Sequence, residues 1–227
     1  MENAAQGLLA VVREANAAHP GPALVLCGPG NNGGDGLALL RLLRGENIPA
    51  YGLLLGAPER LSGDAAANYR RALEAGCGAE YIQDAAQLEL VFQEKWGVIV
   101  DALFGTGLAR PVEGLARAAL EWANAARAYR IAADIPSGVH GGTGEVPGIA
   151  FRADETITFQ AAKRGQLLYP GREHAGKLTV WPIGDLDPAY DIGREVVLEK
   201  EDVAALLPPR AKDSHKGDHG RGLLVAG

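Results

Sequence analysis

Two hydrophobic patterns alternate along the chain. Short apolar runs that lead into glycine or a polar turn are typical of buried strands, whereas longer segments with apolar residues three and four positions apart are typical of helices. The runs that predict strands, with the turns that follow them, are 22–28, 50–56, 96–107, 129–138, 155–160 and 177–183. The segments that predict helices are 7–18, 36–46, 62–77, 84–95 and 114–128. This alternation predicts an α/β fold with a mostly parallel sheet covered by helices on both faces.

The pattern changes at the C-terminal end of the sequence. Residues 199–227 begin with a short helical pattern, pass through a Pro-Pro and charged segment, and end in an apolar run at 222–227 that predicts one more strand. A single strand cannot bury a core by itself. This segment is therefore either a tail packed on the main domain or the start of a second, truncated domain, and the second interpretation fits better.

Composition excludes several classes of function. Of the 227 residues, 47% are hydrophobic and 22% are charged, and the net charge of −6 without a basic run argues against a nucleic-acid-binding surface. No apolar run is long enough to predict a membrane span, and no basic segment precedes the first apolar stretch as in a signal peptide. Cys27 and Cys77 lack metal-ligand spacing and suggest free thiols in a reducing compartment. We therefore expect a cytoplasmic protein.

A glycine-rich turn, GPGNNGGDGL at residues 28–37, follows the first predicted strand. Gly28, Gly30 and Gly33 match the G-x-G-x-x-G spacing of dinucleotide-binding turns. Such sites also need an acidic residue at the end of the second strand, but the first acid after that strand is Glu59, several residues later. Asp35 is expected in the opening turn of the next helix, where its charge would repel a phosphate. The turn therefore predicts a binding loop with a different chemistry.

Three predicted parallel strands run into polar turns. The turns hold Asn31–Asp35 after the first strand, Asp101 with Gly105–Pro111 after the third, and Asp134–Val139 after the fourth. Ligands of open α/β sheets bind outside the carboxyl ends of the strands. If these strands are neighbours, Asn32, Asp101, Asp134 and Ser137 converge there, with Asp101 at least partly shielded. Each aspartate alone could equally cap a helix or loop; together with the asparagine turn they favour a site.

The converging side chains are all oxygen donors. An amide oxygen, a carboxylate and a hydroxyl, with backbone carbonyls nearby, suit a hard cation. Because the set carries only one or two formal charges, it suits a monovalent ion better than a dry divalent site.

Four motifs together give the sequence a family resemblance. CGPGNNGGDGL, VDALFGTGL, ADIPSGV and TFQAAKRGQLLYPGREHAGKLTVWPIG resemble the NAD(P)H-hydrate epimerase family over about residues 1–198. The resemblance implies a Rossmann-like three-layer α/β/α sandwich, usually a homodimer. It also implies an isomerase that interconverts the R and S forms of hydrated NADH and NADPH (NADHX and NADPHX) at C6 of the nicotinamide ring, in cofactor repair.

The same resemblance implies roles for individual residues. It implies a potassium ion held by Asn32, Asp101 and Ser137. The substrate contacts that it implies are Asn31, Asn32, Gly33, Gly34, Asp35, Gly105, Thr106, Gly107, Leu108, Ala109, Arg110, Pro111 and Asp134. These assignments agree with the all-oxygen set expected from the strand ends.

Domain boundaries follow from the resemblance as well. Residues 1–198 correspond to an epimerase domain whose N-terminal helix is expected to be incomplete, because the family usually has more chain before MENAA. Residues 199–227 correspond to a linker and the first part of an ADP-dependent NAD(P)H-hydrate dehydratase domain, which in bacteria is often fused behind the epimerase. Dehydratase activity is therefore expected only in a full-length chain.

Inversion at C6 could proceed by loss of the hydroxyl to an iminium-like species and readdition of water on the other face. Asp101 is the candidate general acid/base, since a positioned carboxyl contributes about 10²–10⁴-fold, although direct potassium ligation would compete with that role. Asp101→Asn is expected to lower epimerisation sharply and to leave the fold intact.

Other polar and aromatic residues carry weaker hypotheses. Lys163 either attracts cofactor phosphates or is a solvated loop lysine. The histidines have no zinc-site spacing, and Trp96, Trp122 and Trp181 are interpreted as packing residues. Two other classes of function stay open: a non-catalytic nucleotide- or partner-binding module of the same fold, and a dehydrogenase that uses an ordinary dinucleotide.

Overall fold

The computed structural model of the chain describes residues 1–108, 110–184, 196–207, 212–215, 217–218, 220–225. The chain divides into two units, Met1–Asp185 and Leu186–Gly227.

A parallel sheet forms the centre of the first unit. Its strands are β1 (Ala23–Cys27), β2 (Ala50–Leu54), β3 (Glu80–Tyr81), β4 (Val98–Ala102), β5 (Tyr129–Ala133), β6 (Glu155–Phe159) and β7 (Lys177–Trp181). They lie in the order β3-β2-β1-β4-β5-β6-β7, and every neighbouring pair is parallel. The sequence predicted all of these strands except β3, whose two residues are too few to give a periodic signal.

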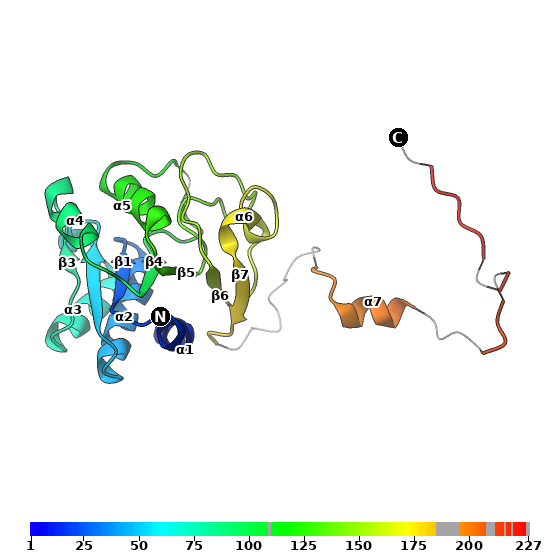
Figure 1. Ribbon diagram of the computed structural model, residues 1–227, viewed down its shortest axis with the longest axis horizontal. Helices are drawn as coiled ribbons and strands as arrows, with labels where there is room; N and C mark the ends of the chain where they lie inside the picture. Colours follow the sequence, from blue (N-terminus) through cyan, green and yellow to red (C-terminus); the bar gives the residue numbers. More distant parts are fainter. Residues whose placement is uncertain (109, 185–195, 208–211, 216, 219, 226–227) are drawn as a thin grey trace. The chain divides into compact units, whose positions relative to one another are not determined.

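Helices cover both faces of this sheet, which confirms the three-layer architecture. The longer helices are α1 (Glu2–Ala18), α2 (Asn31–Gly45), α3 (Gly63–Glu74), α4 (Ala85–Phe92) and α5 (Gly114–Ala125). The short ones are η1 (Pro58–Arg60), η2 (Arg164–Gln166) and α6 (Arg172–Ala175). In Figure 1, α1, α2 and α3 lie below the sheet, and α4 and α5 lie above it.

Alternation along the strands separates the hydrophobic core into two main parts. Successive side chains of a strand point to opposite faces. In β1, Val25 and Cys27 pack with the buried residues of α1, α2 and α3, whereas Leu24 and Leu26 pack with those of α4 and α5. Because both faces are covered, the strand reads as a continuous apolar run, which is why the sequence revealed it.

The asparagine turn is the first turn of α2, so the helix begins at Asn31 and five residues earlier than the periodicity predicted. Asp35 consequently lies beyond the first turn, and the first turn contains no acidic residue, contrary to the expectation from the sequence. Glycine makes this early start possible. A Cβ on Gly33 would lie 1.8 Å from the carbonyl oxygen of Gly28, and a Cβ on Gly36 would lie 2.9 Å from Sγ of Cys27. The helix therefore packs directly on the end of β1.

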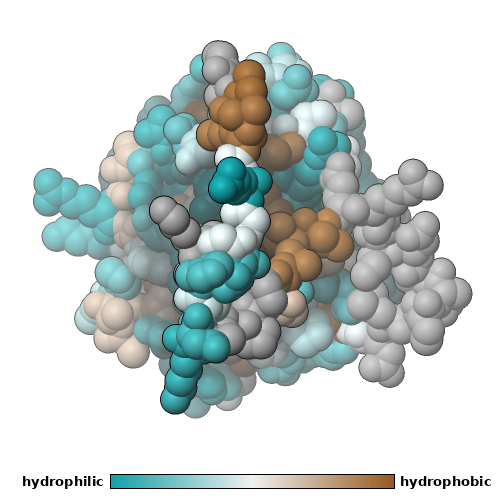
Figure 2. Space-filling model, turned by 90° about the vertical axis from the view of Figure 1, so that its right-hand side faces the viewer, coloured by the Kyte–Doolittle hydropathy of each residue, from teal (hydrophilic) through white to brown (hydrophobic). Residues whose placement is uncertain are grey.

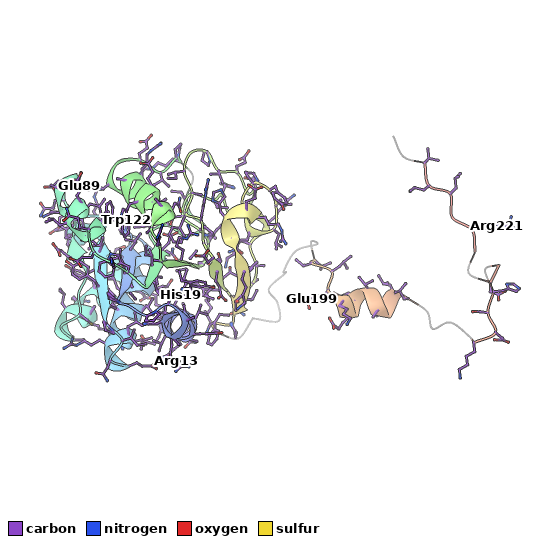
Figure 3. All side chains as sticks on the ribbon, viewed as in Figure 1. Arg13, His19, Glu89, Trp122, Glu199 and Arg221 are labelled. Atoms are coloured by element: carbon purple, nitrogen blue, oxygen red, sulfur yellow. The ribbon has the colours of Figure 1, made fainter. Side chains whose placement is uncertain are left out.

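Aromatic side chains contribute to both helical layers. Trp122 of α5 stacks on Phe92 of α4 with ring centroids 4.2 Å apart and an interplanar angle of 5°. On the other side of the sheet His19, which follows α1, stacks on Tyr129 at 4.9 Å. Figure 3 shows Trp122 and His19 in their separate layers. The interpretation of Trp122 as a packing residue agrees with these contacts.

The second unit contains one helix in its described part, α7 (Lys200–Leu206), where the sequence predicted a short helix. Residues 222–225 form no strand, so that expectation is wrong for the described residues. A strand needs the backbone of a neighbouring strand to pair with, and none of the described strands pairs with this segment. The side chains of Leu223, Leu224 and Val225 are about nine-tenths exposed. The space-filling view in Figure 2 shows hydrophobic groups on the surface that faces the viewer. Among the described residues, no helix is both long and apolar enough to cross a membrane.

The two thiols should differ in reactivity. Cys27 is fully buried in β1, and burial raises the pKa of its thiol far above the usual range, whereas Cys77 is only half-buried. Since the thiolate is the reactive form, we expect a disulfide reagent such as DTNB to modify Cys77 in the native protein and both thiols in denaturant. Rapid modification of Cys27 in a native Cys77→Ser variant would contradict this placement.

Candidate functional site

A cleft lies at the carboxyl ends of β1, β4 and β5. Because β1 pairs with β4 and β4 pairs with β5, the three strand ends are neighbours, as the sequence argument required. The chain leaves β1 towards β2 in one direction and continues from β4 towards β5 in the other, so the cleft is at the switch point where α/β sheets bind ligands. Its volume is about 940 Å³.

Most of the predicted substrate contacts line this cleft. Those on its wall are Asn31, Asn32, Asp35, Gly105, Thr106, Gly107, Leu108, Arg110, Pro111 and Asp134. Gly33 and Gly34 are buried in the first turn of α2 and do not line it. Ala109 lies outside the described residues.

Asp101 and Ser137 lie behind the cleft wall rather than on it. Asp101 is fully buried at the end of β4, and Ser137 is 1% exposed. The Ser137 hydroxyl donates to Oδ1 of Asp101 at 2.7 Å, and the Ser137 N–H donates to Oδ2 at 2.8 Å. The Leu103 N–H donates to Oδ1 at 3.1 Å. Both carboxylate oxygens therefore have partners within the protein.

Burial and hydrogen bonding act in opposite directions on Asp101. Burial disfavours the charged carboxylate and raises the pKa of Asp101 to about 6, while the donors from Ser137 and Leu103 partly offset the rise. The partial shielding expected from the sequence is complete. The same hydroxyl of Ser137 accepts the Phe104 N–H at 2.9 Å, so it joins the turn after β4 to the turn after β5.

Asn32 has polar atoms without a protein partner. The residue is 6% exposed, and neither its Oδ1 nor its Nδ2 has a hydrogen bond in the described part of the chain. A buried polar atom without a partner costs free energy and calls for an explanation, such as a bound ion or water. Gly105 lies against this side chain, since a Cβ there would be 3.7 Å from the amide carbon.

Asp35 faces the cleft from α2. Its burial raises its pKa to about 7; the amino group of Met1, 3.9 Å away, opposes the rise and the carboxylate of Asp134 adds to it. This turn differs from a pyrophosphate cradle because two aspartates, Asp35 and Asp134, lie on the wall of the same cleft and interact electrostatically.

The raised pKa predicts how stability depends on pH. Asp35 binds its proton more tightly in the folded chain, so its contribution makes stability fall as pH rises from about 4 to about 7 and level off above that. Full ionisation should cost on the order of 4 kcal/mol, since the pKa rises from 3.8 to about 7. Urea unfolding at several pH values and fixed salt should show a smaller decline for Asp35→Asn than for the wild type. The exposed Asp64→Asn is the control, and an unchanged pH profile in Asp35→Asn would refute the assignment.

Asp134 has a left-handed backbone, with φ of 64°. Its Oδ1 accepts from the ammonium of Lys163, from the Phe159 N–H at 3.2 Å and from the Thr158 hydroxyl at 3.4 Å. The sequence offered phosphate attraction or solvation as roles for Lys163. The lysine is half-buried and paired with Asp134, so it is not a solvated loop lysine, while phosphate attraction stays a prediction.

Sequence reasoning missed several wall residues. They are Pro29, Gly30, Leu103, Phe104, Val112 and Glu113. All of them directly adjoin the predicted loops, so extending each loop by one or two residues would have found them. In the described residues no group of three or more His, Cys, Asp or Glu side chains could hold a metal ion.

Together, the switch-point cleft and its oxygen-rich walls define a Rossmann-like α/β protein with a candidate small-molecule site. Comparison with known proteins specifies the class further. Residues 1–165 match the family described as YjeF-related protein N-terminus. The chain belongs to this family.

The chain covers different shares of the relatives to which it is similar. The chain is 45% identical over 210 residues to the bifunctional NAD(P)H-hydrate repair enzyme Nnr of Thermofilum pendens. The alignment covers 92% of this chain and 40% of that protein. It is 38% identical over 184 residues to the NAD(P)H-hydrate epimerase of Rhodopirellula baltica, covering 81% of this chain and 74% of that protein. The chain thus spans about 40% of the length of the bifunctional relative.

A solved structure supports the fold. The crystal structure of the yeast protein ynu0, YNL200c, aligns with a TM-score of 0.68 and 20% sequence identity, over 83% of this chain and 79% of the yeast chain. At this identity the likeness concerns the α/β architecture alone.

Proposed function

We propose that this chain catalyses the interconversion of the R and S forms of hydrated NADH and NADPH at C6 of the nicotinamide ring. The observation that carries the proposal is the switch-point cleft, whose walls are formed by the three motif loops after β1, β4 and β5. Two further facts support it. A relative that this chain covers for 74% of its length is named NAD(P)H-hydrate epimerase, and no acidic residue follows β2 directly, as an ordinary dinucleotide site would require.

We propose a potassium ion as cofactor, held by Asn32, Asp101 and Ser137. The donor set fits, because the three side chains offer oxygen ligands with one formal charge. Asn32 supplies the specific support, since its buried amide oxygen has no partner among the described residues. When bound, the ion supplies a fixed positive charge that orders the turns after β1, β4 and β5.

Proton transfer is assigned to the aspartates of the cleft wall. Protonation of the C6 hydroxyl by Asp35 would release water and leave a ring cation, and water would then add to the opposite face and return a proton to a carboxylate. The burial that raises the pKa of Asp35 to about 7 suits it to donate a proton near neutral pH. Asp134 lines the same cleft. Asp101, whose oxygens already accept three hydrogen bonds behind the wall, is better placed to hold the cation and the two turns.

A direct assay tests this proposal. The purified chain is incubated with a single epimer of hydrated NADH or NADPH, and the other epimer is followed by chromatography in potassium and in sodium buffer of equal ionic strength. Conversion faster than the uncatalysed rate, with higher activity in potassium, is expected. A rate equal to the uncatalysed one would refute the function and leave the non-catalytic module as the alternative, and equal rates in both buffers would refute the cofactor.

Domain organisation is proposed on the same basis. Residues 1–198 are assigned to the epimerase domain and residues 199–227 to a linker with the first part of a dehydratase domain. The name of the bifunctional relative supports this division. Adding ADP or ATP to the same incubation tests it, because these 227 residues are expected to form no NADH or NADPH by dehydration.

Assembly and location complete the proposal. We propose a homodimer, supported by the family resemblance and by exposed apolar side chains of the first unit, Leu168, Tyr169 and Val180. Light scattering coupled to size-exclusion chromatography tests it, and a monomer mass would refute it. The cytoplasm is proposed as the compartment because Cys27 and Cys77 are free thiols.

A further inference from the structure

Lys163 makes an unusually complete set of contacts for a lysine beside a cleft. Its ammonium group donates to Oδ1 of Asp134, to the Thr158 hydroxyl at 2.9 Å and to the Phe159 carbonyl at 2.8 Å. A lysine ammonium has three N–H donors, so this geometry uses all of them within the protein. The side chain is 22% exposed, and no donor is left to direct at a cofactor phosphate.

A glutamine in the following short helix holds the backbone of the same aspartate. The Gln166 side chain accepts the Lys163 N–H at 2.7 Å and donates to the Asp134 carbonyl. Gln166 is 1% exposed. The segment after β6 thus forms hydrogen bonds with both the side chain and the main chain of Asp134.

These hydrogen bonds hold a residue whose backbone is in the left-handed conformation. Asp134 has a positive φ, which residues other than glycine rarely adopt without support. Its Oδ1 accepts from Lys163, Thr158 and Phe159, whereas none of the hydrogen bonds found within the described residues ends on its Oδ2. The carboxylate is therefore fixed at one oxygen, while the residue itself lines the cleft.

We propose that Lys163 is a positioning residue, which fixes Asp134 so that its carboxylate meets the substrate in a single orientation. This inference rests on the proposed function, in which Asp134 contacts the substrate. Lys163 itself does not touch the substrate. The role differs from phosphate binding, which would require a donor directed away from Asp134.

Kinetic measurements distinguish positioning of Asp134 from phosphate binding. For Lys163→Met, loss of positioning should lower kcat by about 10- to 100-fold, the scale of a misplacement of roughly 1 Å, with KM within about threefold of wild type. A raised KM with unchanged kcat would instead indicate phosphate binding and overturn the proposal. For Lys163→Ala, propylammonium should restore part of kcat, and sodium chloride at the same concentration should not.

A second lysine provides the matched control. Lys177 pairs with the buried carboxylate of Glu155 at 3.0 Å, but at the other end of β6 and β7 from the cleft. Its side chain is 67% exposed, so Lys177→Met should change kcat less than about twofold. Equal losses in Lys177→Met and Lys163→Met would mean that both act through the fold, which overturns the proposal.

A readout without turnover separates this proposal from the proposed function. The crystal structure of Lys163→Met should show Asp134 with a changed φ or a displaced Oδ1; an unchanged Asp134 would overturn positioning whatever the activity. If wild type fails to epimerise either substrate, the proposed function fails and this structural comparison still decides the role of Lys163. Lys163→Gln, which removes the ammonium but keeps a polar side chain, gives the same comparison if Lys163→Met does not fold.

Discussion

Gly33→Ala is expected to destabilise the fold by about 3 kcal/mol or more, since overpacking a tight contact costs about 1–3 kcal/mol and more when backbone must move. The new Cβ would lie 1.8 Å from the Gly28 carbonyl oxygen and 2.6 Å from its carbon. Both are backbone atoms, so no side chain can rotate away. The gain in helix propensity, about 1 kcal/mol, is too small to offset this. Urea unfolding with a linear extrapolation measures the difference.

Gly30→Ala is the matched control for this substitution. Gly30 precedes α2 in an extended conformation with φ of −99°, and a Cβ there would meet nothing within 4 Å. Because Gly30 is the N-cap of α2, where alanine is less favourable than glycine, Gly30→Ala should lower the free energy of unfolding by no more than about 1 kcal/mol. Equal stabilities of the two variants would refute the direct packing of the first turn of α2 on the end of β1.

Much of the architecture could be predicted because the sheet is buried on both faces. Strand β1 is an unbroken apolar run, and β4 and β5 contain the apolar runs 98–100 and 131–133. Polar turns follow these runs, and their convergence needs only that the strands be neighbours. The start of α2 could not be predicted in the same way. Four residues of its opening, Asn31 to Gly34, have low helix propensity, and only the close approach of Gly33 to Gly28 in the folded chain explains them.

The candidate site also has features that the sequence could predict and features that it could not. Loop positions placed Asn32 and Asp134 correctly on the cleft, because a residue that follows a strand must lie at the sheet edge. Periodicity says nothing about depth beyond the strand end, so it could not show that Asp101 and Ser137 pair with each other behind the wall. The role of Lys163 could not be predicted for another reason. Its partner Asp134 is 29 positions away, and only the pairing of β5 with β6 brings the two together.

Asp134→Asn should lower kcat/KM for epimerisation by about 10²-fold or more, the range for loss of a general acid or base. The fold should persist, because asparagine tolerates the left-handed conformation that Asp134 adopts and its amide oxygen can still accept from Lys163. The single-epimer assay measures the activity, and urea unfolding should place the free energy of unfolding within about 1 kcal/mol of wild type.

Asp101→Asn makes the comparison decisive, because the two aspartates differ in their surroundings. An amide at position 101 has one acceptor oxygen, so either the Ser137 N–H or the Leu103 N–H loses its partner in a fully buried site. A lost partner costs about 1–3 kcal/mol, while removal of a buried charge offsets part of that cost. This variant should therefore lose activity together with its response to potassium, whereas Asp134→Asn should lose activity and keep the order of the turns. If Asp134→Asn retains wild-type turnover, Asp134 takes no part in proton transfer, and Asp35 is the remaining aspartate of the cleft wall that could transfer the proton.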